Sequence, residues 1–241
     1  MGAVTFFDTY ARFYETSKTG PWRNRLNQRY RALIESNQEI LREASILDLA
    51  SHDGRWSFAA LKHGAARVIG IEGREELVRN ARESMEAYGI SRDRFHFILG
   101  DVFREVDDLE RGSFDVVFCF GFFYHTMHHV LLLSKIQRLA SRYLLLDTGI
   151  GTSKETVVEL REEDATEEPN AIPTEGGASD RVLVGYPSKG ALELMLRHFG
   201  YEWSYYDWQG AGITSWEHLE DYRDGHRVSI VAKNVGRKGG P

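Results

Sequence analysis

Three acidic side chains follow short apolar runs of the sequence, at positions where they could bind a charged nucleoside. Asp48 lies in the first run, Glu72 ends the second and Asp101 follows the third. An acid after the second strand of a nucleotide-binding fold accepts hydrogen bonds from a ribose diol. Carboxylates repel a pyrophosphate but attract a cation. Glu72 alone does not separate the two ligands, but Asp48 and Asp53 in the first turn favour S-adenosylmethionine, which has an ammonium, a sulfonium and no phosphate, over a dinucleotide.

The turn after the first run, residues 48–54, has the sequence DLASHDG and contains a single glycine. A nicotinamide enzyme needs glycines here so that its backbone can approach a pyrophosphate at a helix N-terminus. This turn instead carries a bulky His52 and a further acid, Asp53. A nicotinamide oxidoreductase is therefore the weaker interpretation, and an absorbance scan with NADH would test it.

A second group of reactive side chains follows the fourth apolar run, residues 114–120. We expect His125 to act as a general base or to orient an acceptor, because imidazole titrates near neutral pH. His128 and His129 open the next predicted helix, where a capping or surface role is expected. No carboxylate lies near these histidines in the sequence, so they lack the ligand set of a metal site. Cys119 lies inside the run and is expected to be inert core.

The elements that must position these residues alternate along the chain. Short apolar runs predict strands, and amphipathic segments between them predict helices. Such alternation is typical of a doubly wound α/β fold with a mostly parallel sheet, which binds ligands beyond the carboxyl ends of its strands. Strands are expected at 46–50, 67–72, 95–99, 114–120, 143–147, 201–208 and 227–233, and helices at 55–63, 75–88, 128–140 and 188–199.

Two segments lie outside this alternation. Residues 1–44 are predicted to form an N-terminal helical lid, with its second helix running from Pro21 to Glu43. Residues 45–241 are the expected cofactor-binding domain, with a cap inserted at 150–187. The ends of the cap, 156–160 and 182–185, are expected to pair as a hairpin over the site. The window 159–180 holds eight acids and one base, and is interpreted as a solvated loop.

Composition limits the class of protein. The chain has 241 residues, of which 42% are hydrophobic, so it suits one domain with a cap. No apolar run reaches the length of a membrane span, and a formal net charge of −6 argues weakly against a nucleic-acid surface. One cysteine and no recognisable secretory signal lead us to expect a cytoplasmic protein.

In the order of residues 48–54, Glu72, Asp101 and 114–121, the chain resembles the class I S-adenosylmethionine-dependent methyltransferases, although Ala50 and His52 stand where that family usually has glycine. The resemblance implies a seven-stranded sheet whose last strand is antiparallel. It also implies that the methionine end of the cofactor lies by the turn, the ribose by Glu72 and the adenine by Asp101. The residues expected to bind the cofactor are Asp48, Ala50, His52, Gly54, Glu72, Gly73, Asp101, Val102 and Phe120.

The aromatic residues indicate the acceptor. They are concentrated in the expected lid and after the fourth strand, and ligand pockets are mainly apolar with few polar anchors. Phe120 and Gly121 stand where catechol-type relatives have a magnesium-binding acid. We therefore predict metal-independent methyl transfer to oxygen, a carboxylate or a hydroxyl, of a small hydrophobic molecule such as a lipophilic acid. The expected catalytic residues are His125 and Tyr124, and the expected substrate-binding residues are Tyr10, Tyr14, Trp22, Phe122 and Phe123.

Two alternatives stay open. Residues 121–125 are similar to the Tyr-His turn of relatives that modify wobble uridines, so a tRNA wobble-base methyltransferase is one alternative, and copurifying RNA would support it. The glycine-poor turn motivates the other, a non-catalytic cofactor-binding module. The interpretation as a non-catalytic module gains support if a labelled methyl group never leaves the cofactor.

Overall fold

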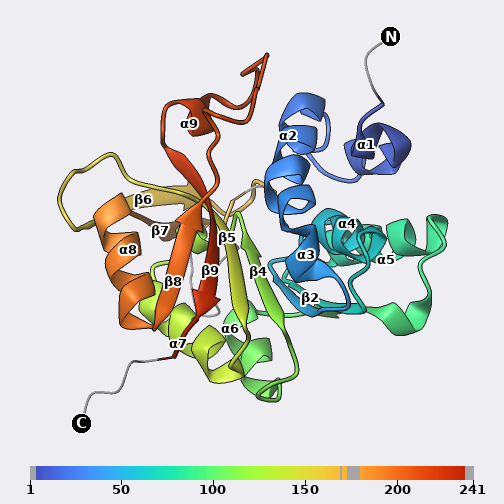
Figure 1. The fold of residues 1–241 in the computed structure, drawn as a ribbon, viewed down its shortest axis with the longest axis horizontal. Coiled ribbons are helices and arrows are strands. Elements are labelled where there is room, and N and C mark those ends of the chain that lie inside the picture. Colours follow the sequence, from blue (N-terminus) through green and yellow to red (C-terminus); the bar gives the residue numbers. More distant parts are fainter. Residues whose placement is uncertain (1–3, 169, 173–179, 237–241) are drawn as a thin grey trace.

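A seven-stranded sheet forms the centre of the molecule in the computed structural model, which describes residues 4–168, 170–172 and 180–236 (Figure 1). Its strand order is β3-β2-β1-β4-β5-β9-β8. The last strand runs antiparallel to both neighbours, and the pairs from β3 to β5 are parallel. The predicted doubly wound, mostly parallel sheet with an antiparallel last strand is confirmed. The strands are β1 Ser45–Leu49, β2 Arg67–Glu72, β3 Phe95–Leu99, β4 Val116–Phe120, β5 Tyr143–Gly149, β8 Tyr201–Tyr205 and β9 Arg227–Asn234.

Helices cover both faces of this sheet, and alternate strand residues enter the two cores. On one face Ile46 and Phe118 pack with the N-terminal helices and with α4 and α5. On the other face Leu47 and Val117 pack with α6, α7 and α8. Because both faces are buried, the central strands are largely apolar instead of alternating, apart from buried polar residues such as Asp48 of β1 and Asp147 of β5. These helices are α4 Arg55–Lys62, α5 Glu75–Ala87, α6 Val102–Glu105, α7 His129–Leu139 and α8 Lys189–His198.

The N-terminal helical segment is more broken than predicted. The expected helix from Pro21 to Glu43 is divided because the Asn37 side chain donates to the carbonyls of Ala32 and Leu33, at 3.3 and 3.1 Å. Side-chain bonds of this kind compete with the helical ladder. The elements observed are α1 Phe6–Thr9, the 3-10 turn η1 Ala11–Tyr14, α2 Arg23–Leu33, η2 Glu35–Asn37 and α3 Gln38–Leu41.

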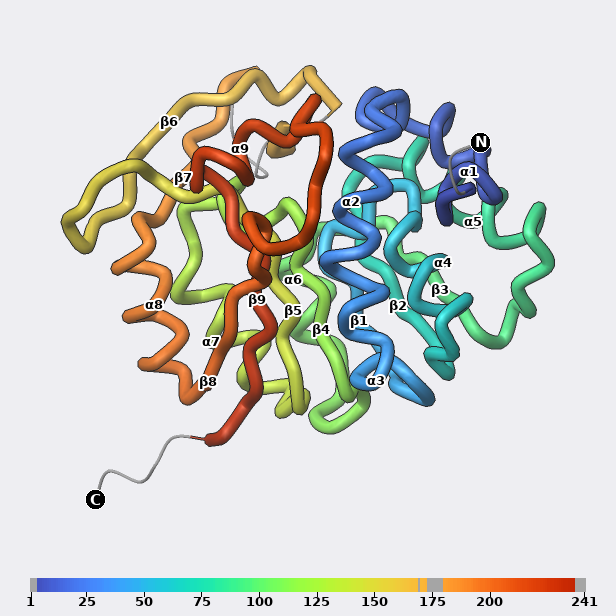
Figure 2. The backbone as a smooth tube through the Cα atoms, turned by 45° about the horizontal axis from the view of Figure 1, so that its top comes forward, coloured from blue at the N-terminus to red at the C-terminus, as the bar shows by residue number. Residues whose placement is uncertain are grey.

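The inserted segment contains a hairpin of its own. Strands β6 Val158–Asp164 and β7 Arg181–Pro187 pair antiparallel, which confirms the predicted pairing and extends it. The interpretation of residues 159–180 as a solvated loop is therefore wrong for its first part. Figure 2 shows the hairpin, α2 and the short helix α9 Glu220–Arg223 at the same end of the sheet. The division into lid, cap and cofactor domain stays a prediction.

Among the described residues, no helix combines the length and the apolar character that a membrane span requires.

Candidate active site

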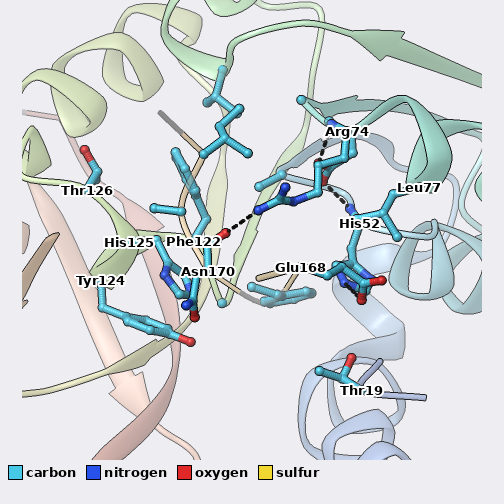
Figure 3. Close-up of a pocket in the computed structure, with 18 of the residues that line it drawn as sticks. Thr19, His52, Arg74, Leu77, Phe122, Tyr124, His125, Thr126, Glu168 and Asn170 are labelled. Atoms are coloured by element: carbon cyan, nitrogen blue, oxygen red, sulfur yellow. Dashed lines mark hydrogen bonds and ion pairs between the residues drawn. The ribbon is translucent and has the colours of Figure 1, made fainter. Parts of the chain in front are cut away.

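A cavity of about 390 Å³ opens at the carboxyl ends of the parallel strands. Its walls come from the segments that follow β1, β2, β3 and β4, together with α2, the β6–β7 hairpin and Arg227 of β9. This is the edge at which open α/β sheets bind ligands, and the volume is typical of a small-molecule pocket. Figure 3 shows side chains from opposite walls facing one another across it.

The turn after β1 keeps an unusual backbone without the usual glycines. Three alternate residues have positive φ angles: Ala50 at 52°, His52 at 55° and Gly54 at 75°. L-residues adopt this region at a cost of about 1–2 kcal/mol each. At Gly54 a side chain is also excluded by space, because a Cβ atom there would lie 2.9 Å from both Ala81 and Phe97. The turn therefore adopts left-handed backbone at each of the three positions where a glycine-rich loop would supply it.

Glu72 and Asp101 both line the cavity. Glu72 is nearly buried, and its two oxygens accept the backbone N–H groups of His52 and Arg74, each at 2.9 Å. Each carboxylate oxygen has a further lone pair for a ligand hydroxyl. Asp101 begins α6 and accepts the N–H of Arg104 at 3.1 Å through one oxygen. Both acids are thus fixed by backbone donors and keep acceptor capacity.

Asp48 and Gly54 are not among the residues that line the cavity. The Asp48 carboxyl is buried behind the turn, where the Ser57 hydroxyl donates to it at 2.6 Å. Burial raises the pKa of Asp48 to about 7. Asp48 therefore acts on a bound ligand only indirectly, through the conformation of the turn. Of the other residues expected to bind the cofactor, Ala50, His52, Gly73, Val102 and Phe120 do line the cavity.

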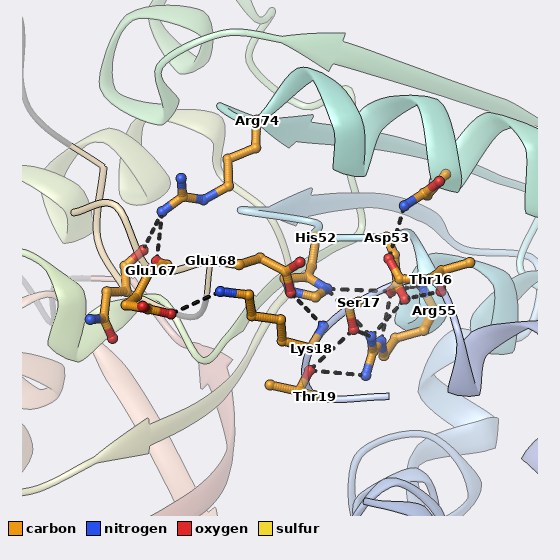
Figure 4. A network of polar contacts seen from close by, with 12 residues as sticks. Thr16, Ser17, Lys18, Thr19, His52, Asp53, Arg55, Arg74, Glu167 and Glu168 are labelled. Atoms are coloured by element: carbon orange, nitrogen blue, oxygen red, sulfur yellow. Dashed lines mark hydrogen bonds and ion pairs between the residues drawn. The ribbon is translucent and has the colours of Figure 1, made fainter. Parts of the chain in front are cut away.

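A buried ion pair fastens the N-terminal segment to the turn (Figure 4). Two nitrogens of Arg55 donate to the two oxygens of Asp53, each at 2.6 Å, and the Thr16 hydroxyl donates to the same carboxylate at 2.5 Å. Burial alone would raise the pKa of Asp53, but the charge of Arg55 and the hydrogen bonds lower it well below its usual range. The Asp53 carboxylate therefore stays ionised and stabilises the conformation of the turn.

A chain segment after β6, residues 165–168 and 170–172, crosses the cavity, and we call it the strap. The Arg74 guanidinium donates to the carbonyls of Glu167 and Asn170 at 3.1 and 3.0 Å (Figures 3 and 4). The Lys18 ammonium lies 2.8 Å from Glu167, on the side of the N-terminal segment. Ile172 occupies the space that a side chain at Gly73 would need. The strap thus joins the N-terminal segment to the loop after β2.

His52 also contacts the strap. Its imidazole nitrogens lie 3.5 Å from Asp53 on one side and 3.5 Å from Glu168 on the other. Burial disfavours the charged imidazole, but the hydrogen bonds with these two carboxylates outweigh burial and raise the pKa of His52.

The side chain of His125 forms a close pair with Glu163 of β6. The distance from Nδ1 to Oε2 is 2.6 Å, and the two side chains are only 10% and 12% exposed. Burial opposes ionisation of Glu163, but the hydrogen bond and charge of His125 and the N–H of Ala171 lower its pKa. An ionised carboxylate only accepts hydrogen bonds, so Nδ1 carries a proton, and in the neutral form of the ring Nε2 is the basic nitrogen. The pair has the composition of a general base and the group that orients it.

Aromatic side chains surround this pair. Trp22, Phe122 and Tyr124 line the cavity as expected, and Tyr186 of β7 joins them. The rings of Tyr124 and Tyr186 lie 4.9 Å apart.

Three other expected substrate-binding residues lie outside the cavity lining. Tyr10 packs edge-on against Phe58, Tyr14 is buried and donates to Asp8 at 2.8 Å, and Phe123 is fully buried. These three aromatic side chains contribute to packing of the protein interior and not to the cavity wall.

His129 also differs from its expected surface or capping role. It is buried, and its Nε2 lies 3.0 Å from the carbonyl of Gly185 in the hairpin. His128 precedes α7 at its N-terminal end, as expected. Cys119 is buried within β4, and burial raises the pKa of its thiol, in keeping with inert core.

Sequence reasoning missed the polar residues that the inserted segment and the last strand bring to the cavity. Glu163 and Glu168 lie in an acid-rich window of the sequence, where nothing distinguishes them from their acidic neighbours. The only signal of a role in the site was their position beside a predicted hairpin strand. Nothing in the sequence sets Arg29 apart from the other arginines of α2. Arg74 and Arg227 belong to no sequence motif. All five of these residues, the two glutamates and the three arginines, line the cavity.

Comparisons with known proteins agree with this geometry. Residues 46–142 match the family model described as a methyltransferase domain. A putative ribosomal RNA large subunit methyltransferase of Methanocaldococcus jannaschii is 33% identical over 106 residues, which are 43% of this chain and 26% of that one. This chain thus spans about a quarter of the length of that relative.

Two solved structures share the fold. The N-terminal domain of EvdMO1, crystallised in the presence of SAH and D-fucose, is 24% identical over 87% of this chain and 82% of its own, with a TM-score of 0.60. The DhpI–SAH complex is 17% identical over 95% of this chain and 94% of its own, with a TM-score of 0.59. The matched domain, the sheet order and the acids at the strand ends together indicate an S-adenosylmethionine-dependent methyltransferase domain in residues 46–142.

Proposed function

We propose that the protein transfers a methyl group from S-adenosylmethionine to a hydroxyl or carboxylate oxygen of a small, largely apolar molecule, without a metal. The observation that carries this proposal is the 2.6 Å contact between His125 and Glu163 in the wall of the cavity. An aliphatic or phenolic hydroxyl has to lose its proton as it is methylated, and an oriented imidazole is suited to take it. The proposal therefore favours a hydroxyl as the reacting group.

The residues present fit the cofactor. The turn of residues 48–54 would hold the methionine end, Glu72 the ribose hydroxyls, and Asp101 with Val102 the adenine. Acids with free acceptor capacity suit a ligand that carries net positive charge. When bound, S-adenosylmethionine supplies an electrophilic methyl group on a sulfonium.

The protein's own groups would then act on the acceptor. His125 Nε2 takes the hydroxyl proton, and Glu163 holds the ring by Nδ1 and stabilises the imidazolium that forms. The aromatic walls at Trp22, Phe122 and Tyr186 position the acceptor and exclude water, since much of the rate of a displacement comes from holding the reacting groups in line.

Metal independence is part of the proposal. Within the part of the chain that the structure describes, no group of three His, Cys, Asp or Glu side chains could hold a metal ion.

A labelled-methyl assay tests the proposal. The protein is incubated with radiolabelled S-adenosylmethionine and a panel of phenols, aliphatic alcohols, carboxylic acids and amines. His125→Ala is expected to lower turnover by about 10²–10⁴-fold while leaving the affinity for S-adenosylhomocysteine within about twofold. His96→Ala, an exposed histidine on β3, is the matched control. Equal loss of turnover and cofactor affinity would show that His125 shapes the pocket instead.

RNA methylation is the second candidate, because the M. jannaschii relative is named as an rRNA methyltransferase. It predicts that label enters RNA in preference to every small molecule of the panel. Binding of S-adenosylhomocysteine without transfer to any acceptor would favour a non-catalytic module.

A further inference from the structure

Three arginines contribute to the wall of the cavity. Arg25 and Arg29 come from α2 and Arg227 comes from β9, and all three line the cavity. Arg25 is paired with Asp221 through two contacts of 2.6 and 2.7 Å. Arg29 and Arg227 are left to share one carboxylate, that of Asp147.

Asp147, the residue that Arg29 and Arg227 share, is fully buried in β5. One of its oxygens accepts from Arg29 at 3.0 Å and from Arg227 Nε at 2.6 Å. The other accepts from the hydroxyls of Tyr222 and Ser229 at 2.8 and 2.7 Å. The carboxylate is thus fully used in holding the two guanidinium groups in place.

Three guanidinium groups share two carboxylates, those of Asp147 and Asp221. The Glu163 carboxylate lies in the same cavity wall, but its hydrogen-bond partners are His125 and the N–H of Ala171, not these arginines. The arginines therefore have more donors than the two carboxylates beside them accept, and a bound anion would accept from the remaining donors.

Arg29 also has unused donors. Its Nε is buried, and within the described residues neither Nε nor Nη1 has a hydrogen-bond partner. The guanidinium lies over the Trp56 ring, at 5.0 Å from the centroid. A planar guanidinium with free donors matches a carboxylate.

We propose that Arg29 and Arg227 bind a carboxylate of the acceptor, so that the substrate class is small hydroxy acids. This inference rests on the proposed function, because it places the reacting hydroxyl at His125. Tyr124 fixes the spacing: its ring lies 4.0 Å from the His125 ring, and its hydroxyl accepts from Arg227 at 3.4 Å. Arg227 and His125 thus contact the same side chain, so a small acceptor suffices to reach both.

The test compares matched acidic and neutral probes on protein saturated with S-adenosylhomocysteine. The probes are 4-hydroxybenzoate, 4-hydroxyphenylacetate and 4-hydroxycinnamate, each with its methyl ester, and binding is measured by titration calorimetry. At least one acid is expected to bind roughly tenfold or more tightly than its ester. Arg29→Met and Arg227→Lys are expected to reduce that preference to about threefold or less. Arg31→Met, an exposed arginine of the same helix, is the control and should keep it.

Arg227→Lys keeps a cation beside Asp147, and Arg29→Met leaves Arg227 in place, so folding is preserved in at least one variant. Equal binding of every acid and its ester to the wild type would overturn the inference, as would a preference that survives in both variants. Failure of the proposed function looks different. In that case an acid binds through the arginines but no methyl group is transferred, whereas methylation of neutral hydroxyl compounds as efficiently as of acids contradicts only the inference.

Discussion

His125 Nδ1 and Glu163 Oε2 lie 2.6 Å apart, although one residue follows β4 and the other belongs to the inserted hairpin. Replacing Glu163 by Gln removes the charge that stabilises an imidazolium and lets the side-chain amide donate to Nδ1, which would move the ring proton to Nε2. We expect kcat to fall by about 10²–10⁴-fold with little change in cofactor affinity.

The control for Glu163→Gln is Glu162→Gln, because Glu162 is exposed on the same strand. Steady-state kinetics of both variants would show whether turnover requires the Glu163 carboxylate. If Glu163→Gln turned over like the wild type, His125 would not need an orienting carboxylate.

The second prediction concerns Glu72 and the cofactor. Glu72→Gln should weaken S-adenosylhomocysteine binding by about 1.5–3 kcal/mol, roughly 10–150-fold in Kd, because a hydrogen bond to a charged group is lost. Glu76→Gln, on the exposed face of α5, should change nothing. Calorimetry on the two variants measures the difference, and an unchanged Kd in Glu72→Gln would exclude a ribose contact.

The third prediction concerns stability and pH. Burial raises the pKa of Asp48 to about 7, so between about pH 4 and pH 7 the folded state binds a proton that the unfolded state has released. The contribution of Asp48 to stability therefore falls as pH rises through this window and is most unfavourable above it. Asp48→Asn should be more stable than the wild type at pH 8, by roughly 4 kcal/mol for a pKa raised by about three units, and the difference should vanish near pH 4.

Urea unfolding at several pH values would check the Asp48 prediction, with the exposed Asp108→Asn as control. A stability difference that does not depend on pH would mean that Asp48 is already ionised in the folded protein at low pH.

The fourth prediction concerns the strap. Arg74 ties it to the loop after β2 through the carbonyls of Glu167 and Asn170. Arg74→Ala removes these bonds, so the strap should open more often and S-adenosylhomocysteine should dissociate roughly 5–50-fold faster, the effect of about 1–2 kcal/mol. Arg79→Ala is the control, since Arg79 is exposed on α5. Stopped-flow fluorescence, using the cavity-lining Trp22 and Trp56, would follow the release. Identical rates in the two variants would contradict a gating role.

Much of the fold was accessible from the sequence because its signals are local. The apolar runs of a buried parallel sheet and the alternation with amphipathic helices predicted β2 and β3 to the residue. The acids at the strand ends followed from the topology, since carboxyl ends of parallel strands share one edge.

The rest of the site depends on long-range register. Glu163 meets His125 only because β6 pairs with β7 in one alignment, Glu163 opposite Val182, and nothing near His125 in the chain encodes that alignment. The aromatic residues were poor predictors of the substrate-binding wall for a different reason. Tyr10 and Trp22 are both aromatic residues of the N-terminal segment, yet Tyr10 packs against the core and Trp22 lines the cavity.

The two halves of the cavity come from different parts of the chain. Glu72 and Asp101 lie within the matched domain of residues 46–142, whereas Arg29, Glu163 and Arg227 lie outside it. Changes in the hairpin, in α2 or at single side chains of β9 would therefore alter which acceptor the proposed methyltransferase binds, while Glu72 and Asp101 stay in place. Because the hairpin forms a sheet of its own, its exchange would leave the seven-stranded sheet unbroken.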